Sequence, residues 1–178
     1  MSVGGEWPAA SVEARLDTED GICVLTYHKL DTQAIIASVT DDKAGATAVF
    51  IGTTRDSFKG RTVTRLDYQA YSKVAIKTMA DIIRQARQQT SRSEHHVEGY
   101  VSSIIKCAVH HRLGTVPVGE SSIVIAVSSP HRKESFVACE YILEEVKRKA
   151  QIWKREFYEG EREGDAEWKE NVTTSKSA

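Results

Sequence analysis

Several features that would define a function class are missing from this chain of 178 residues, which has only three cysteines and three prolines. No apolar run approaches the roughly 20 residues that a helix needs to cross a bilayer. The first residues also lack the basic and then apolar layout of a secretory signal. The sequence therefore predicts a cytoplasmic protein with no membrane partner.

The cysteines and histidines do not form a recognisable metal or disulfide pattern. Cys23, Cys107 and Cys139 contain no CxxC pair, and their odd number argues against a disulfide framework. We expect reduced thiols that pack in the core. His110 and His111 are adjacent, so on a strand they point to opposite faces, and no third ligand is suitably spaced. No metal and no cofactor are expected.

The charge balance excludes a general nucleic-acid coating protein. The chain has 24 Lys and Arg against 25 Asp and Glu, for a net charge of -1. It also lacks a Walker loop, a Rossmann glycine pattern and a nucleophile elbow, which leaves nucleotide hydrolysis, dinucleotide redox chemistry and serine hydrolysis without support. Any anion site must therefore be local.

Apolar periodicity predicts a single α+β domain with a mainly antiparallel sheet and two long helices. The expected helices are a short one within 31–44 and long ones over 72–89 and 133–150, and the expected strands are 22–27, 46–52, 62–71, 101–109 and 121–128. In the second long helix, Phe136, Cys139, Leu143 and Val146 predict one buried stripe. We expect residues 1–20 to be a flexible extension, 21–156 the catalytic domain, and 157–178 an acidic tail partly docked through Trp168.

Two corners of this fold are candidate anion sites. Arg55 follows the strand that ends near Gly52, although an Arg55–Asp56 pair within a turn is an alternative interpretation. His131 and Arg132 stand at the start of the last helix, where unpaired N–H groups favour negative charge. The alternative there is a solvated helix start with His131 as its cap.

The densest basic patch lies within residues 147–155. Lys147 is adjacent to the buried position Val146, which predicts a side chain at the boundary between core and solvent. Repulsion from the neighbouring cations favours its neutral amine, which is a nucleophile or a base. The alternative interpretation is that this run of charges is a solvent-exposed helix surface.

Six ordered motifs together resemble one known family, that of the large, catalytic subunit of molybdopterin synthase. They are Phe50–Asp56, Tyr68–Tyr71, His111–Gly114, Gly119–Glu120, Ser129–Arg132 and Lys147–Glu156. The resemblance covers about residues 21–168. Two positions depart from the family pattern, Gln69 and Gln151, and neither is a residue to which we assign chemistry.

The resemblance implies an α/β hammerhead fold and a homodimer that carries one small ubiquitin-like sulfur-carrier subunit at each end, a heterotetramer. It implies a sulfurtransferase that moves two sulfurs from the thiocarboxylate at the carrier's C-terminal Gly-Gly to cyclic pyranopterin monophosphate, giving molybdopterin for molybdenum cofactor biosynthesis. It further implies that Lys147 is catalytic, that Lys154 assists, and that Arg55, His131 and Arg132 hold the substrate. A residue of the second protomer is expected to complete the site.

Two other hypotheses remain open at this point. The patch 147–155 could belong to a non-enzymatic anion- or protein-binding module. Alternatively, Cys139 or Cys107 could carry a persulfide in a different sulfurtransferase. The first predicts that replacing Lys147 removes no turnover, and the second predicts that replacing a cysteine abolishes activity.

Overall fold

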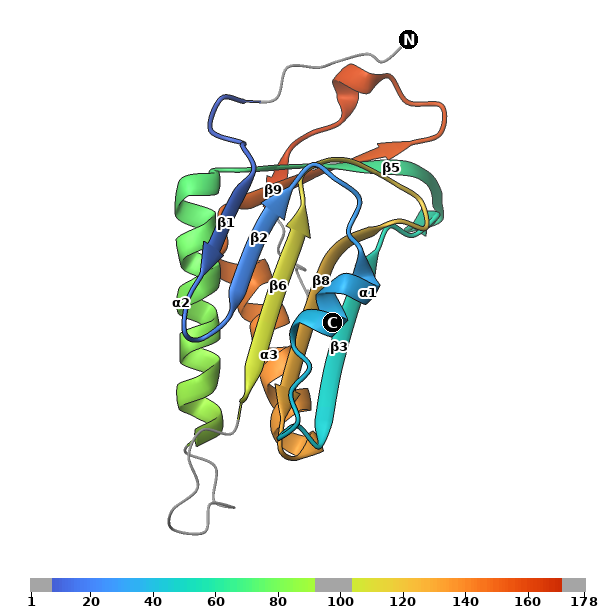
Figure 1. Cartoon of the computed structure of the whole chain (residues 1–178). Helices are drawn as coiled ribbons and strands as arrows, with labels where there is room; N and C mark the ends of the chain where they lie inside the picture. The colour runs from blue at the N-terminus through green and yellow to red at the C-terminus, as the bar shows by residue number, and fades with distance from the viewer. Residues whose placement is uncertain (1–7, 92–103, 171–178) are drawn as a thin grey trace.

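The computed structural model describes residues 8–91 and 104–170 and contains two β-sheets (Figure 1). The larger sheet has the strand order β1-β2-β6-β8-β3, and among its described strands only the pair β2–β6 is parallel. Its strands are β1 (Ala14–Asp17), β2 (Ile22–Thr26), β6 (Lys106–Arg112), β8 (Ser121–Ser129) and β3 (Ala46–Thr53). The predicted α+β class with a mainly antiparallel sheet is confirmed.

Two long helices, α2 (Ser72–Ser91) and α3 (Arg132–Lys149), pack against one face of the larger sheet. In α2 the residues Ala75, Met79 and Ile83 recur at helical spacing and are fully buried. The short helix α1 (Thr32–Ser38) covers the middle of the opposite face, over β6 and β8. The centre of the sheet is therefore apolar on both faces, and the main core lies between the sheet and the long helices.

The smaller sheet crosses one end of the larger one, as the head crosses the shaft of a hammer (Figure 1). Its strand order is β10-β9-β5-β4, and β7 also pairs with β5. The strands are β4 (Ser57–Phe58), β5 (Arg61–Ala70), β7 (Gly114–Pro117), β9 (Ile152–Tyr158) and β10 (Lys169–Glu170), with a 3-10 helix at Glu163–Asp165. This arrangement places the end of β3 and the end of α3 beside the smaller sheet.

Described residues near both ends of the chain pack against the domain: residues 8–20 do not form the expected flexible extension, and the tail makes contact through Trp168, the residue expected to dock it. Within residues 8–20, β1 pairs with β2, and the buried Ser11 accepts a hydrogen bond at Oγ from Ala70 N, 3.1 Å away. The extension therefore contributes to the domain, because its backbone completes a sheet edge. At the other end, β10 pairs with β9, and the Arg155 guanidinium carbon lies 4.7 Å from the ring centroid of Trp168. Residues 1–7 and 171–178 lie outside the described residues.

The buried stripe of α3 also differs from the prediction, because Phe136 is 64% exposed. The side chains that face the sheet near this end of α3 are Ser135 and Ala138, which are small enough to let the helix approach β3 and β8 closely. Periodicity alone could not distinguish these two helix faces. Of the predicted strand 101–109, residues 101–103 lie outside the described residues, and β6 begins at Lys106. No described helix is long and apolar enough to span a membrane.

Candidate active site

The last turn of α3 carries three basic residues, and Lys147 is the one that faces an aromatic ring of β3. Lys147 is half-buried, and its Nζ lies 6.0 Å from the ring centroid of Phe50. Arg148 and Lys149 instead both contact the carboxylate of Glu145. Among the described residues no carboxylate lies within 4.0 Å of Lys147 Nζ. Lys147 therefore keeps its amine available at the boundary that the sequence predicted.

Lys154 follows after the turn between α3 and β9, and it is held by an acid that the sequence analysis did not single out. Its Nζ lies 3.2 Å from Oε1 of Glu156, whose side chain is only 9% exposed. Burial raises the pKa of Glu156, but hydrogen bonds from the Tyr158 hydroxyl and from Lys154 outweigh burial, so the pKa lies below its ordinary value. Lys154, Glu156 and Tyr158 occupy alternate positions, a pattern typical of a strand. The sequence analysis did not predict β9 and so did not identify the pairing of Lys154 with Glu156.

Arg55 lies in the loop that leaves β3, and the loop is fixed by its neighbours. The buried Thr54 donates its backbone N–H to the carbonyl of Glu120 and accepts from the N–H of Gly119. Arg55 itself is exposed, with its guanidinium carbon 6.0 Å from the Phe58 ring centroid. Among the described residues no ion pair joins Arg55 to Asp56, so the alternative of a self-paired turn has no support.

A buried polar group supports this end of the larger sheet. His111 is buried, its ring meets the Tyr68 ring edge to face at 4.9 Å, and its Nδ1 lies 2.7 Å from the carbonyl oxygen of Arg112. Burial lowers the pKa of His111 to about 4, although the hydrogen bond opposes this shift, so the ring is neutral at pH 7. In the described part of the chain, no three His, Cys, Asp or Glu side chains are grouped so as to hold a metal ion.

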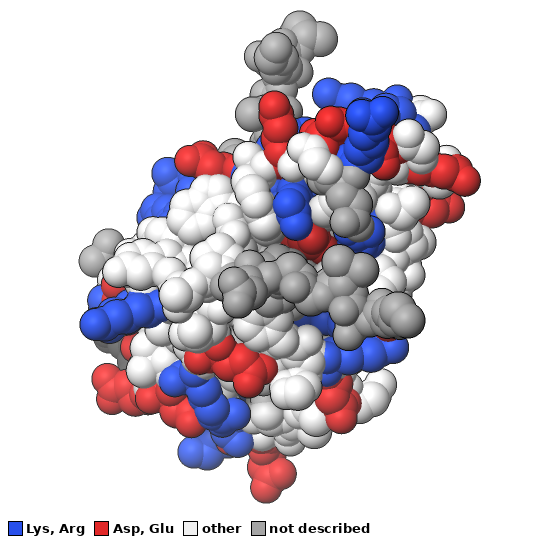
Figure 2. Space-filling view, turned by 90° about the horizontal axis from the view of Figure 1, so that it is seen from above, with Lys and Arg blue, Asp and Glu red and all other residues white. Residues whose placement is uncertain are grey.

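Charge of neither sign dominates the end of the molecule that carries Lys147. Seen from above in Figure 2, lysines and arginines are interspersed with aspartates and glutamates. One example is Glu120, which contacts both Lys29 and Arg112. The positive charge available to a ligand is therefore local, as the near-neutral composition predicts.

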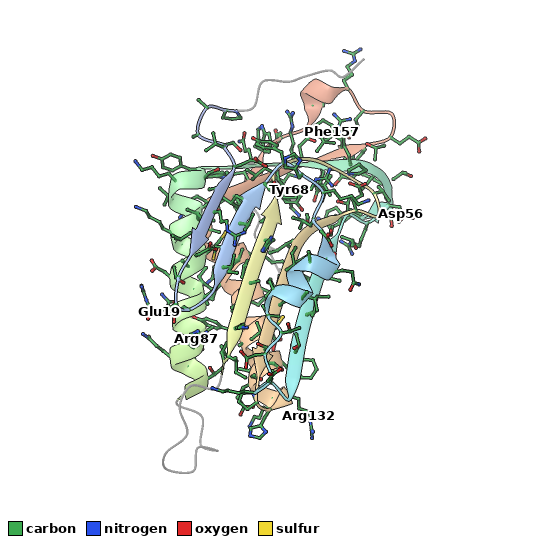
Figure 3. All side chains as sticks on the ribbon, viewed as in Figure 1. Glu19, Asp56, Tyr68, Arg87, Arg132 and Phe157 are labelled. Atoms are coloured by element: carbon green, nitrogen blue, oxygen red, sulfur yellow. The ribbon has the colours of Figure 1, made fainter. Side chains whose placement is uncertain are left out.

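His131 and Arg132 lie at the opposite end of the molecule. His131 is the N-cap residue of α3 but makes no capping hydrogen bond with its side chain, and both residues are exposed. Figure 3 shows Arg132 at one end of the larger sheet, with Tyr68 and Asp56 at the other. Lys147 follows Arg132 by fifteen positions in α3, which corresponds to about 22 Å along the helix axis. The structure thus groups Arg55, Lys147 and Lys154 at one end and does not bring His131 and Arg132 to them.

All three cysteines are unpaired and buried, as predicted. Burial raises the pKa of Cys23 to about 12 and of Cys139 to about 11, and it also raises that of Cys107. The thiolate is the reactive form of cysteine, so these thiols are poorly suited to carry a persulfide. This geometry argues against the cysteine-based alternative.

Comparisons with known proteins identify the family of this chain. The model of the family described as MoaE protein matches residues 25–149 of the chain. The chain belongs to the MoaE family. A relative in Aedes aegypti, "Molybdopterin synthase catalytic subunit 2", is 44% identical over 151 residues, which cover 85% of this chain and 90% of the relative. The match confirms the family that the motifs predicted, and with it the predicted function in molybdopterin synthesis.

Solved structures support the fold of this MoaE-family chain. Molybdopterin synthase from Staphylococcus aureus aligns with a TM-score of 0.66 and 28% identity, over 82% of this chain and 94% of the other. A complex of subunits 1 and 2 of the molybdopterin-converting factor from Helicobacter pylori aligns with a TM-score of 0.58 and 19% identity, over 79% and 87% of the two chains. The second likeness concerns the fold alone.

Proposed function

We propose that this chain is the sulfur-transferring, catalytic subunit of a molybdopterin synthase. Its substrate is cyclic pyranopterin monophosphate, and a small ubiquitin-like carrier supplies two sulfurs, one at a time, as a thiocarboxylate at its C-terminal Gly-Gly. The observation that best supports this proposal is the placement of Lys147, a half-buried amine without a carboxylate partner among the described residues. Such an amine can meet the anionic end of a carrier.

The chemistry assigns a role to each basic residue at this end of α3. Each sulfur that is transferred replaces an oxygen on the substrate, so a carbon–sulfur bond forms there as a carbon–oxygen bond breaks. On the carrier, the acyl–sulfur bond breaks and water supplies the oxygen of the C-terminal carboxylate that remains. Lys147 acts at the carrier carbonyl as a general acid and base, or accepts the acyl group transiently on its neutral amine. Lys154 and Arg55 hold the substrate and its phosphate. No cofactor is needed for these steps.

We further propose that His131 and Arg132 act in the site of a second copy of the chain. The length of α3 keeps them about 22 Å from Lys147 of their own chain, which is too far for one substrate to touch both. Near them, Phe136 and Val137 are 64% and 48% exposed, an apolar surface that a second copy would cover. A two-fold dimer through this face, with one carrier at each end, gives the predicted heterotetramer.

The alternative of a non-enzymatic binding module has less support from the geometry. Within residues 147–155, the structure pairs four cations with acids: Arg148 and Lys149 with Glu145, Lys154 with Glu156, and Arg155 with Asp67. A surface that captures an acidic partner needs unpaired positive charge.

The three unpaired, buried thiols also agree with the reducing cytoplasm that we propose as the compartment of this protein.

The decisive experiment mixes the protein with thiocarboxylated carrier and cyclic pyranopterin monophosphate and measures the dithiolene product. Lys147→Ala should lower turnover by at least about 100-fold, because it removes the acid–base group, and should leave the melting temperature unchanged. Lys149→Ala is the matched control, since it removes the same charge from the same turn but faces Glu145. No product from the unaltered protein would refute the function, and normal turnover by Lys147→Ala would refute the role of Lys147.

A further inference from the structure

Three polar side chains occupy alternate positions on one face of β9 and form a continuous chain of contacts. The Tyr158 hydroxyl lies 2.6 Å from Oε2 of Glu156, and the other oxygen of that carboxylate lies 3.2 Å from Lys154 Nζ. The hydroxyl donates, because an ionised carboxylate can only accept. One donor on each oxygen fixes the orientation of the carboxylate.

Tyr158 is itself held in place by contacts that do not involve its hydroxyl. The guanidinium carbon of Arg61 lies 3.6 Å from the centroid of its ring, and Arg61 is ion-paired with Glu161. Antiparallel pairing with Val63 of β5 fixes the backbone at this position. The ring can therefore keep its place when the hydroxyl alone is removed.

The charged groups around Glu156 come from every strand packed beside it. Lys154 and Tyr158 lie on β9 itself, Lys169 lies on β10 opposite Lys154, and Tyr68 lies on β5. Arg61 and Glu161 act on Tyr158. Of these, the Tyr158 hydroxyl and the Lys154 amine make the hydrogen bonds to the carboxylate. Removing one of them leaves the carboxylate held from one side only.

We propose that Tyr158 is a positioning residue for sulfur transfer: its hydroxyl orients Glu156, which in turn holds the Lys154 amine toward the substrate. This inference rests on the proposed function for its consequence in turnover. Its geometric part, that the hydroxyl orders the pair of Glu156 and Lys154, stands independently of the reaction.

The first test compares Tyr158→Phe with Tyr141→Phe, which also removes one part-buried tyrosine hydroxyl bonded to a side chain, that of Gln85 at 3.2 Å. Tyr158→Phe should lower kcat about 10- to 100-fold, the effect of one hydrogen bond to a charged group. The KM for the carrier should stay within about 2-fold. Tyr141→Phe should leave kcat unchanged. Wild-type kcat in Tyr158→Phe, or an equal loss in both variants, would overturn the proposal.

A double-variant cycle separates positioning from a general structural effect. If Tyr158 acts through Glu156, then Tyr158→Phe should cause no further loss of kcat in a Glu156→Gln background. Additive losses would mean that the hydroxyl acts by another route, and they would overturn the proposal.

The last readout does not depend on turnover, so it distinguishes this inference from the proposed function. NMR titration of the Glu156 carboxyl should show a higher pKa in Tyr158→Phe than in the unaltered protein, because a donor to the ionised form has been lost. An unchanged titration would refute the positioning role even if the protein is active. A raised pKa in a protein without sulfurtransferase activity would support the contact while refuting the function.

Discussion

At the C-terminal end of α3 the protein itself holds its basic side chains in place, whereas at the N-terminal end they project outward. Lys147 lies over the Phe50 ring, and Lys154 is bonded to a buried acid. His131 and Arg132 are exposed at the other end. One end of the helix is thus organised within a single chain, and we propose that a second copy of the chain completes the other.

The difference indicates that motifs adjacent in sequence order need not share a site within one chain. Ser129–Arg132 and Lys147–Glu156 flank the same helix, yet the helix holds them apart. A two-fold dimer would bring the exposed end of one copy to the organised end of the other. The following predictions test whether the two ends are two halves of one site.

The largest expected effect is recovery of activity when two inactive variants are mixed. Lys147→Ala and Arg132→Ala damage opposite ends, so a mixed dimer has one intact site and one doubly damaged site. After dissociation and random reassociation, the sulfur-transfer rate should rise to about one quarter of wild type, because half of the dimers are mixed and each has one intact site.

The control for this mixture pairs Lys147→Ala with the double variant Lys147→Ala, Arg132→Ala, in which no combination restores a site. If the site lay within one chain, the first mixture would be no more active than its components. That result would refute the shared site.

The organised end should be sensitive to small increases in volume. A Cβ on Gly52 would lie 2.7 Å from Ile123 Cγ2 and 3.2 Å from Phe50 Cε1, so Gly52→Ala must displace the Ile123 side chain and presses on the ring beside Lys147. We expect a loss of about 1–3 kcal/mol in the free energy of unfolding by urea, together with reduced turnover. Gly164→Ala is the control, since nothing described lies within 4 Å of its added Cβ. Equal stability of the two variants would contradict the close contact at Gly52.

The organised end should also make the fold sensitive to acid through His111. Its folded-state pKa of about 4 lies below its ordinary 6.5, so the unfolded chain binds the proton first and stability falls as the pH drops between these values. This residue should contribute a loss of about 2 kcal/mol between pH 7 and pH 5. Urea unfolding at both pH values should show a smaller loss in His111→Gln, and an identical loss would show that another group causes it.

Sequence reasoning predicted the elements whose pattern is set by burial. Ala75, Met79 and Ile83 identified α2 because one face of that helix meets the core. The same reasoning did not identify β9. Lys154 and Glu156 are charged residues that form an ion pair in a largely buried position, whereas charged residues in a sequence usually indicate solvent exposure. The prediction that Phe136 is buried was wrong for the opposite reason. An aromatic residue at helical spacing indicates a core position, and its exposure follows only from the positions of the neighbouring strands.

The candidate site was only partly accessible to sequence reasoning for the same reason. The boundary position of Lys147 follows from its neighbour Val146, whereas its contact with Phe50 joins segments almost a hundred residues apart. The contact between Glu156 and Lys154 depends on strand β9, which was not predicted, whereas the separation of Arg132 from Lys147 follows from a helix length that the predicted helix 133–150 already implied. Long-range pairing is the information that a single sequence does not carry.

The strand order has a consequence for how the protein is made on the ribosome. Among the described strands, β3 pairs with β8, β2 pairs with β6, and β5 forms its longest pairing with β9. Most strands in the first half of the chain are therefore synthesised before at least one of the strands with which they pair. The larger sheet cannot close before β8 has been translated, and the smaller sheet cannot close before β9 and β10. We therefore expect a late folding step and exposed strand edges during translation.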